Sequence, residues 1–204
     1  MTAAEQKAAL RREIKAALAA LTPEERAAGD ALLFARFLSL PQMKAAQQVM
    51  LFAGMGSEPD TMSLIAALLQ AGKAVALPRC LSGHNMEARI WDGAVPLVRH
   101  PLGMLEPSEQ CPVVPPEELD LILAPALCYD TAGRRLGHGG GFYDRFLARC
   151  GCPVAGLCRD AVLQQAVPSE KHDLPVSIVV TETRIYETRP PEGGPASDGS
   201  ACVG

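Results

Sequence analysis

Apolar residues near the start of the chain recur at the spacing of helices. They line one face of residues 3–20, so this segment is predicted to be an amphipathic helix. The sequence Thr-Pro-Glu-Glu at 22–25 then predicts a second helix start, with threonine as N-cap, proline at the first helical position and acids in the first turn. We expect this helix to continue to about Leu38 and to be stopped by Pro41.

Short continuous apolar runs follow the two helices and predict buried strands. Residues 48–53 and 73–77 are such runs, the second closed by Pro78, and they flank a helical pattern at 61–70. Residues 119–124 form the clearest central strand. This order predicts an α/β fold, a largely parallel sheet between helical layers in a Rossmann-like three-layer architecture. Further strands are predicted at residues 86–91, 153–157 and 176–180.

The composition of the chain changes in two places. Residues 80–118 are rich in proline and predict a long irregular excursion over the surface. After Tyr186 the chain consists mainly of Pro, Glu, Gly and Ser with few apolar residues, which is typical of disorder. We therefore predict one α/β domain over residues 1–186 and a disordered tail over 187–204, with ligands meeting above the carboxyl ends of the strands.

Composition and charge narrow the class of protein. With 48% hydrophobic and 21% charged residues, the 204-residue chain resembles an ordinary soluble globular protein. The 19 basic and 23 acidic residues give a net charge of −4, which argues against nucleic acid as a partner. No apolar run is long enough for a membrane span or a signal peptide. We expect a cytoplasmic monomer whose seven irregularly spaced cysteines are free thiols.

A glycine-rich stretch between Arg135 and Asp144 is the strongest candidate for chemistry. Its four glycines, at 137, 139, 140 and 141, permit positive φ angles, so that successive amides can face an anion before the helix predicted at 142–149. Arg135 can add a bidentate phosphate contact, and Asp144 can reach a metal ion carried by that phosphate. The stretch is neither a Walker loop nor a GxGxxG fingerprint. From spacing alone, a flexible turn remains an alternative.

The same stretch carries a resemblance to a known family. RLGHGGGFYDR is similar to the RLG-x-G-x-G-[YF]-YD signature of the 5-formyltetrahydrofolate cyclo-ligases, also called methenyltetrahydrofolate synthetases. Five other segments resemble elements of this family in the right order, so that the likeness covers about residues 5–183: Lys7–Arg11, Glu58–Thr61, Met104–Pro107, Leu119–Pro125 and Pro168–Asp173, followed by a closing strand that ends at Glu182. Phe142, where tyrosine is commoner, and Phe52 depart from the family pattern.

The resemblance implies an ATP-dependent ring closure. In this family 5-formyltetrahydrofolate becomes 5,10-methenyltetrahydrofolate, with release of ADP and phosphate. An N-formyl group is an amide, whose resonance makes its carbon a poor electrophile. Phosphorylation of the formyl oxygen turns that oxygen into a leaving group, so that the neighbouring folate nitrogen can attack. The implied cofactors are ATP and Mg²⁺. Two alternatives remain, a relative acting on another formyl or amide compound and a nucleotide-binding module without catalysis.

The resemblance also implies a role for each matched residue. Arg135 and Tyr143 are the catalytic candidates. Asp144 and Asp173 are the Mg²⁺ ligands, for which a helix cap and a turn residue are the structural alternatives. Substrate-binding candidates are Ala53, Glu58, His138, Gly139, Gly140, Gly141 and Phe142. ATP-binding candidates are Lys7, Arg11, Arg135, Gly137, His138, Gly139, Gly140, Gly141, Phe142 and Tyr143, although Lys7 and Arg11 can equally form a solvated helix face.

Overall fold

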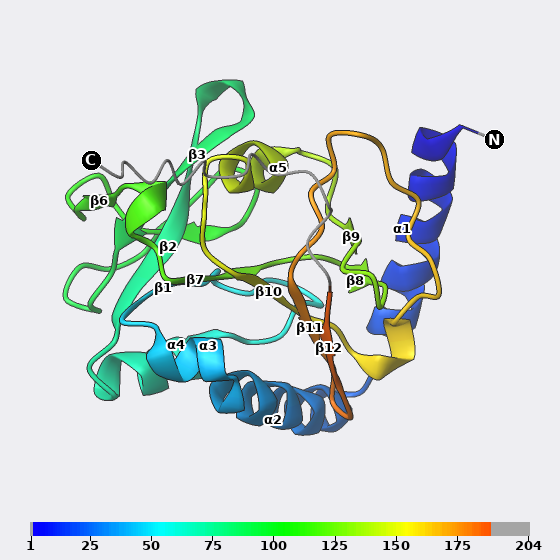
Figure 1. Ribbon diagram of the computed structural model, residues 1–204, viewed down its shortest axis with the longest axis horizontal. Coiled ribbons are helices and arrows are strands. Elements are labelled where there is room, and N and C mark those ends of the chain that lie inside the picture. Colours follow the sequence, from blue (N-terminus) through cyan, green and yellow to red (C-terminus); the bar gives the residue numbers. More distant parts are fainter. Residues whose placement is uncertain (1, 189–204) are drawn as a thin grey trace, which may run out of the picture.

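A computed structural model describes residues 2–188 of the chain (Figure 1). Its main sheet has eight strands in the order β12-β11-β10-β7-β1-β2-β3-β6. The five strands from β11 to β2 run parallel, whereas β12, β3 and β6 are antiparallel to their neighbours. The strands are β1 (Gln48–Met50), β2 (Ala74–Leu81), β3 (Asn85–Ile90), β6 (Val113–Val114), β7 (Leu121–Ala124), β10 (Val154–Leu157), β11 (Ile178–Val180) and β12 (Ile185–Glu187).

The remaining elements within residues 2–188 are five α-helices, three 3₁₀ turns and two small ribbons. One ribbon pairs β4 with β5, and the other pairs β8 with β9. Their bounds are β4 (Val98–Arg99), β5 (Leu105–Glu106), β8 (Cys128–Tyr129) and β9 (Arg135–Leu136). The helices are α1 (Ala3–Ala19), α2 (Pro23–Ser39), α3 (Pro41–Ala45), α4 (Met62–Gln70) and α5 (Phe142–Leu147), with 3₁₀ turns η1 (Ser82–His84), η2 (Pro116–Glu118) and η3 (Asp160–Val162).

Side chains that alternate along the parallel strands build two cores, one on each face of the sheet. Val49 and Leu51 pack with side chains of α2, α3 and α4, whereas Met50 between them packs with Phe146 of α5. A third apolar cluster joins Ile14 of α1 to the β8–β9 ribbon and β11. Helices therefore cover both faces of the sheet (Figure 1), and the predicted three-layer α/β fold is confirmed.

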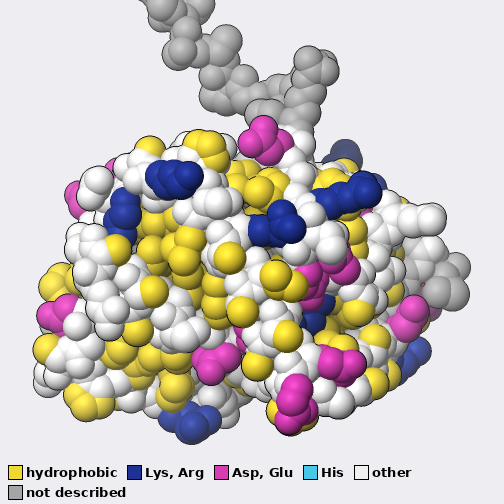
Figure 2. Space-filling view, turned by 90° about the horizontal axis from the view of Figure 1, so that it is seen from below, with side chains coloured by type: hydrophobic (Ala, Val, Ile, Leu, Met, Phe, Trp, Pro, Cys, Tyr) yellow, Lys and Arg dark blue, Asp and Glu magenta, His cyan; other side chains and the backbone are white. Residues whose placement is uncertain are grey.

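The face covered by α2, α3 and α4 is seen in Figure 2. Hydrophobic side chains gather there between scattered Lys, Arg, Asp and Glu. On α2, the side chain of Leu32 is 52% exposed. No helix within residues 2–188 combines the length and the apolarity that crossing a bilayer requires.

The first two helices begin as the sequence predicts. The hydroxyls of Thr2 and Thr22 each accept a hydrogen bond from the amide of the glutamate three residues later, and each threonine amide donates one to the side chain of that glutamate. The helix α2 ends at Ser39, close to the predicted Leu38. Pro41 does more than stop α2, because it occupies the first turn of α3, where a missing amide hydrogen costs nothing.

Three predicted boundaries were wrong. The strand β2 passes through Pro78 to Leu81, because β1 pairs with it only as far as Ala76 and an edge-like position tolerates proline. Residues 80–118 hold β3, β4, β5 and β6 and are much less irregular than predicted. The helix predicted at 142–149 ends at Leu147.

The predicted tail also starts too early. Glu187 lies in β12 opposite Ile178 of β11, and Thr188 donates from its amide to the carbonyl of Ser177 and from its hydroxyl to the carbonyl of Val176. These two residues are therefore part of the fold. The rest of the predicted tail, 189–204, lies outside the described residues.

Candidate functional site

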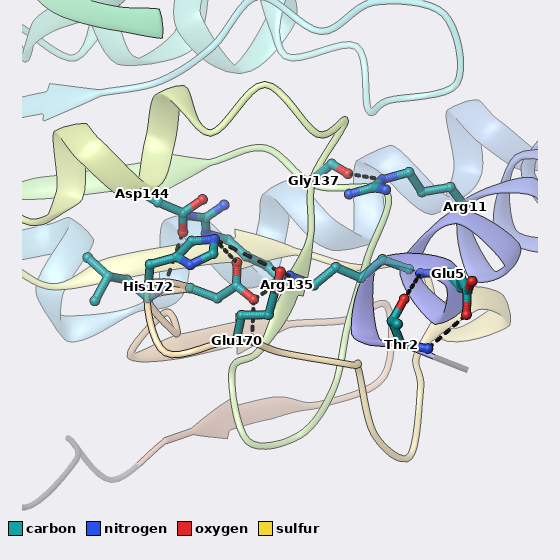
Figure 3. Close-up of polar contacts among 11 residues, drawn as sticks. Thr2, Glu5, Arg11, Arg135, Gly137, Asp144, Glu170 and His172 are labelled. Atoms are coloured by element: carbon teal, nitrogen blue, oxygen red, sulfur yellow. Dashed lines mark hydrogen bonds and ion pairs between the residues drawn. The ribbon is translucent and has the colours of Figure 1, made fainter.

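A cavity of about 200 Å³ lies among three segments that are far apart in the sequence. These are the first half of α1, the stretch from β9 into α5, and the loop at 170–173. Figure 3 shows Glu170 and His172 beside the Arg135–Asp144 pair, with Arg11 reaching over from α1. The lining residues are Ala4, Lys7, Arg11, Arg135, Leu136, Gly139, Gly141, Asp144, Glu170, His172 and Asp173.

The β8–β9 ribbon positions Arg135 in this cavity. Buried Asp130 accepts hydrogen bonds from the amides of Ala132 and Arg134, and its other oxygen lies 2.6 Å from Arg134 Nε. Gly133 closes the turn at φ +82°, and a side chain there would meet the carbonyl of Val176 at 2.2 Å. Because side chains alternate along a strand, Arg134 is held by Asp130 and Arg135 faces the other way.

Arg135 and Asp144 form an ion pair at one side of the cavity. The two are 2.5 Å apart between Nη2 and Oδ1, and the side chain of Arg135 is only 6% exposed. The amide of Leu174 donates to the same oxygen of Asp144 at 3.1 Å, which fixes the carboxylate. The Nε of Arg135 is buried and has no hydrogen-bond partner within residues 2–188. Such a donor calls for an acceptor from a ligand or water.

Lys7 bridges α1 to the loop at 170–173. Its Nζ lies 2.8 Å from Glu170 Oε2 and 2.6 Å from Asp173 Oδ2. Burial lowers the pKa of Lys7, but hydrogen bonds and charge from the two carboxylates outweigh burial and raise it overall. Burial correspondingly raises the pKa of Asp173, and the contacts with Lys7 outweigh this and lower it. Both groups are therefore charged at neutral pH.

The glycine loop is tied to α1 by Arg11. The Nε of Arg11 donates to the carbonyl of Gly137 at 2.9 Å. Gly139 has φ +101° and Gly141 has φ +68°, a left-handed conformation that side chains disfavour. Gly141 directly precedes α5, so its conformation sets the angle at which Asp144 enters the cavity. These glycines are therefore required by the path of the backbone.

A second group of predicted residues lies outside the cavity, around Glu58. The side chain of Glu58 is 7% exposed, and burial raises its pKa to about 7, although the amide of Met55 donates to it at 3.0 Å and lowers the value. His138 Nε2 lies 3.8 Å from Glu58 Oε1. Burial lowers the pKa of His138, with Lys15 and Arg11 acting in the same direction.

Tyr143 lies beside this acidic group. Its hydroxyl is buried without a hydrogen-bond partner within the described residues. Burial raises its pKa well above the usual value, and the charge of Glu58 acts in the same direction. The hydroxyl therefore stays protonated and is a donor toward a ligand rather than a base.

The structure brings only part of the predicted set to the cavity. Lys7, Arg11, Arg135, Gly139, Gly141, Asp144 and Asp173 line it. Phe142 does not, and its ring instead lies 5.3 Å from that of His84 at the tip of the β2–β3 hairpin. Ala53 follows β1 in the sequence, and its side chain is buried at 7% exposed. The other predicted residues that do not line the cavity are Gly137, His138, Gly140, Tyr143 and Glu58.

Sequence reasoning assigned no role to Glu170 or His84. Glu170 lines the cavity and pairs with Lys7. The sequence did indicate this residue, because Glu170 belongs to the segment Pro168–Asp173 that resembles an element of the family. His84 has φ +58° in η1, and no sequence pattern connects this hairpin tip to the loop that carries Phe142.

The candidate site lies only partly at the carboxyl ends of the strands, where the sequence predicts that the ligands meet. Glu58 follows the end of β1, and the stretch leading to Asp144 follows β7. The loop at 170–173, by contrast, precedes β11, so the cavity extends onto the face covered by α1 and α5.

The donor set of the cavity suits a phosphate carrying a metal ion. Three cationic side chains, Lys7, Arg11 and Arg135, match the charge of a polyphosphate. Asp144 and Asp173 offer the oxygen ligands that Mg²⁺ prefers, and Glu170, His172 and Asp173 have donor atoms within 4.8 Å of one another. The unpartnered Nε of Arg135 points to the same chemistry.

Known proteins resemble this chain in sequence and in fold. Residues 3–182 match the sequence profile of the 5-formyltetrahydrofolate cyclo-ligase family. The 5-formyltetrahydrofolate cyclo-ligase of Escherichia coli K12 is 33% identical over 174 residues, covering 82% of this chain and 96% of the relative. That of Mycolicibacterium smegmatis is 38% identical over 145 residues, covering 65% and 72%. The NMR structure of Aquifex aeolicus 5,10-methenyltetrahydrofolate synthetase superposes with a TM-score of 0.81 at 27% identity, covering 96% of this chain and 99% of that one.

Proposed function

The chain belongs to the 5-formyltetrahydrofolate cyclo-ligase family, and from this premise we propose that it converts 5-formyltetrahydrofolate to 5,10-methenyltetrahydrofolate. ATP is consumed, and ADP and phosphate are released. The observation that carries the proposal is the cavity itself, where three cations and three carboxylates from family-like segments converge. ATP supplies the chemistry that makes the formyl oxygen a leaving group, while the residues of the chain bind, orient and neutralise charge.

The cations take the phosphate end of the nucleotide in this proposal. Arg11 and Arg135 reach the cavity from two different elements, α1 and β9, so that both can contact a triphosphate. Lys7, which forms ion pairs with Glu170 and Asp173, contributes a further positive charge to the cavity. The amides freed by Gly139 and Gly141 add neutral donors. Charge neutralisation of this kind is the main contribution of proteins to phosphoryl transfer.

Asp144 and Asp173 would hold Mg²⁺. The amide of Leu174 fixes the Asp144 carboxylate, and the amide of Glu170 fixes that of Asp173 at 2.6 Å, so both ligands are oriented by backbone. Bound Mg²⁺ would neutralise the phosphate oxygens, and Lys7 and Arg135 would turn from the carboxylates toward phosphate.

The folate end is assigned to the group around Glu58. A buried carboxylate accepts strong hydrogen bonds, which suits the N–H donors of a pterin ring. His138, 3.8 Å from Glu58, and Phe142 flank the cavity-lining Gly139 and Gly141 in sequence, and Ala53 completes the substrate set. Arg135 and the protonated Tyr143 hydroxyl act as the catalytic pair, donating toward the reacting phosphoryl and formyl oxygens.

The setting of the enzyme is part of the same proposal. We expect the α/β domain, which β12 and Thr188 extend beyond residue 186, to act as one unit and as a monomer in the cytoplasm. Neither nucleic acid nor membrane takes part in the reaction.

The proposal is tested by incubating the chain with 5-formyltetrahydrofolate, ATP and Mg²⁺ while recording the near-ultraviolet absorbance of the methenyl product. Product should form only when all three are present, together with one equivalent of ADP. Well-folded protein that forms no product at high concentration refutes the proposal. ATP turnover that ignores folate would indicate a different substrate.

Adjacent arginines on α1 provide a matched test of the site. Arg11 lines the cavity, whereas Arg12 is exposed. Arg11→Ala should raise the KM for ATP at least tenfold, because a charge-assisted phosphate contact contributes about 1.5–3 kcal/mol. Arg12→Ala should behave as wild type. Equal effects of the two substitutions would contradict the assignment of α1 to the nucleotide.

A further inference from the structure

Three metal-binding side chains meet where the β4–β5 ribbon contacts β2. Cys80 comes from β2, His100 follows β4, and Glu106 belongs to β5. Their sulfur, nitrogen and oxygen donor atoms all lie within 4.8 Å of one another. We propose that these three residues bind a Zn²⁺ ion that fastens the β4–β5 ribbon to β2. None of them lines the cavity assigned to ATP and Mg²⁺.

Glu106 is the first reason for this assignment. It is 4% exposed, and its Oε1 accepts a hydrogen bond from the Cys80 amide at 2.9 Å. No lysine, arginine or histidine nitrogen within the described residues forms an ion pair with it. The neighbouring Arg79 is directed instead to the carbonyl of Pro107 and to Glu109. Buried carboxylates usually pair with a cation or coordinate a metal, so this one has a place for a positive charge.

Cys80 supplies the second reason, because its half-buried thiol places a sulfur donor within 4.8 Å of the donor atoms of both His100 and Glu106. A divalent metal displaces the thiol proton and neutralises both the thiolate and the carboxylate.

The donor set and its spacing favour Zn²⁺ over Mg²⁺ or Ca²⁺. Sulfur and imidazole nitrogen are ligands of borderline metals, whereas Mg²⁺ and Ca²⁺ take oxygen. With zinc–ligand distances of roughly 2.0–2.3 Å, tetrahedral ligands lie about 3.3–3.6 Å apart. The upper limit of 4.8 Å between these donors therefore requires them to close by about 1.5 Å at most. Three protein ligands leave the fourth position to water.

His100 can make this adjustment at small cost. Its Nδ1 accepts a hydrogen bond from the amide of Leu102 at 3.2 Å, so metal binding through Nε2 requires the proton to move to Nδ1 and this bond to be released. Leu102 lies in a turn and is 65% exposed, so water can replace the lost acceptor. The ribbon is short, with two residues in each strand, which lets His100 move.

The position of the ribbon gives the ion a role beside the folate end. A side chain at Gly103 of the ribbon turn would lie 3.5 Å from the Met55 side chain. The amide of Met55 in turn donates to Glu58. Fastening the ribbon to β2 therefore supports the loop that carries Glu58.

Cobalt(II) titration of the full chain in a non-thiol reductant tests the site. Cobalt bound to a thiolate gives an intense near-ultraviolet charge-transfer band, which the oxygen-donor magnesium site cannot produce. We expect a band that saturates at one equivalent and disappears on addition of ZnSO₄. Cys80→Ser should abolish it, and His100→Ala should weaken cobalt affinity at least tenfold. Cys150→Ser, which alters another half-buried thiol that is not part of this cluster, should leave it unchanged.

Two outcomes would overturn the inference. One is folded wild-type protein without a band, and the other is a band that survives in Cys80→Ser. Far-UV circular dichroism verifies the fold of each variant, and the half-buried His100→Ala decides the question if Cys80→Ser does not fold. The cobalt band measures metal binding at Cys80 and not folate turnover. A negative result would therefore refute the zinc site and leave the proposed enzymatic activity untouched.

Discussion

The buried carboxyl group of Glu58 should make the protein less stable at alkaline pH. Burial raises its pKa from 4.5 to about 7. At one pKa unit per 1.36 kcal/mol, this shift corresponds to about 3 kcal/mol. The folded state binds the proton more tightly than the unfolded state, so stability is greatest below the unfolded pKa and falls as pH rises through the folded pKa. The loss is complete only above the folded value of about 7.

Glu58→Gln removes this cost while preserving an acceptor for the Met55 amide. Urea unfolding at pH 8 should show the variant more stable than wild type by about 3 kcal/mol, and at pH 5 by less than about 1 kcal/mol. Glu109→Gln is the matched control, since that side chain is 80% exposed, and it should change stability by less than about 0.5 kcal/mol at either pH.

The same variant separates stability from binding. Loss of the carboxylate should raise the KM for folate and leave the KM for ATP unchanged, because Glu58 does not line the nucleotide cavity. A stability gain of equal size at pH 5 and pH 8, or no gain at all, would refute the reasoning about burial.

Three further outcomes follow from the packing and the metal ligands. Gly156→Ala should lower the free energy of unfolding by roughly 2–3 kcal/mol in urea titrations, because the new methyl would lie 2.2 Å from the Tyr129 ring, while Gly151→Ala, with open space around it, should be neutral. Arg159→Leu should cost about 3–5 kcal/mol by leaving Asp30, 2.5 Å away, buried without a cation, and a loss under 1 kcal/mol would contradict this. Excess EDTA should abolish methenyl formation and added Mg²⁺ restore it, whereas turnover insensitive to EDTA would exclude the magnesium assignment.

Much of the fold follows from local patterns in the sequence. The Thr22 capping box, the proline after it and the apolar run at Leu121–Ala124 each specify an element through contacts within a few residues. The strand–helix–strand order then restricts the sheet to a parallel arrangement, since short crossovers allow few alternatives. The position of Lys7 and Arg11 on the same helix face likewise follows from their spacing of four residues.

The features that could not be predicted depend on contacts between distant residues. Pro78 continues its strand only because β1 stops pairing at Ala76, which no local signal reveals. The bond from Lys7 to Asp173 spans 166 residues, so its effect on both pKa values required the structure. The cluster around Cys80 depends on a two-residue ribbon folding back on β2, and neither the spacing of the cysteines nor that of the histidines predicts it.

A crystal structure with a non-hydrolysable ATP analogue and Mg²⁺ tests the central claim most directly. We predict a triphosphate in the cavity between α1 and the glycine loop, contacted by Lys7, Arg11 and Arg135, with the magnesium on Asp144 and Asp173. Nucleotide bound elsewhere on the molecule, or a magnesium ion that neither aspartate contacts, would contradict the account.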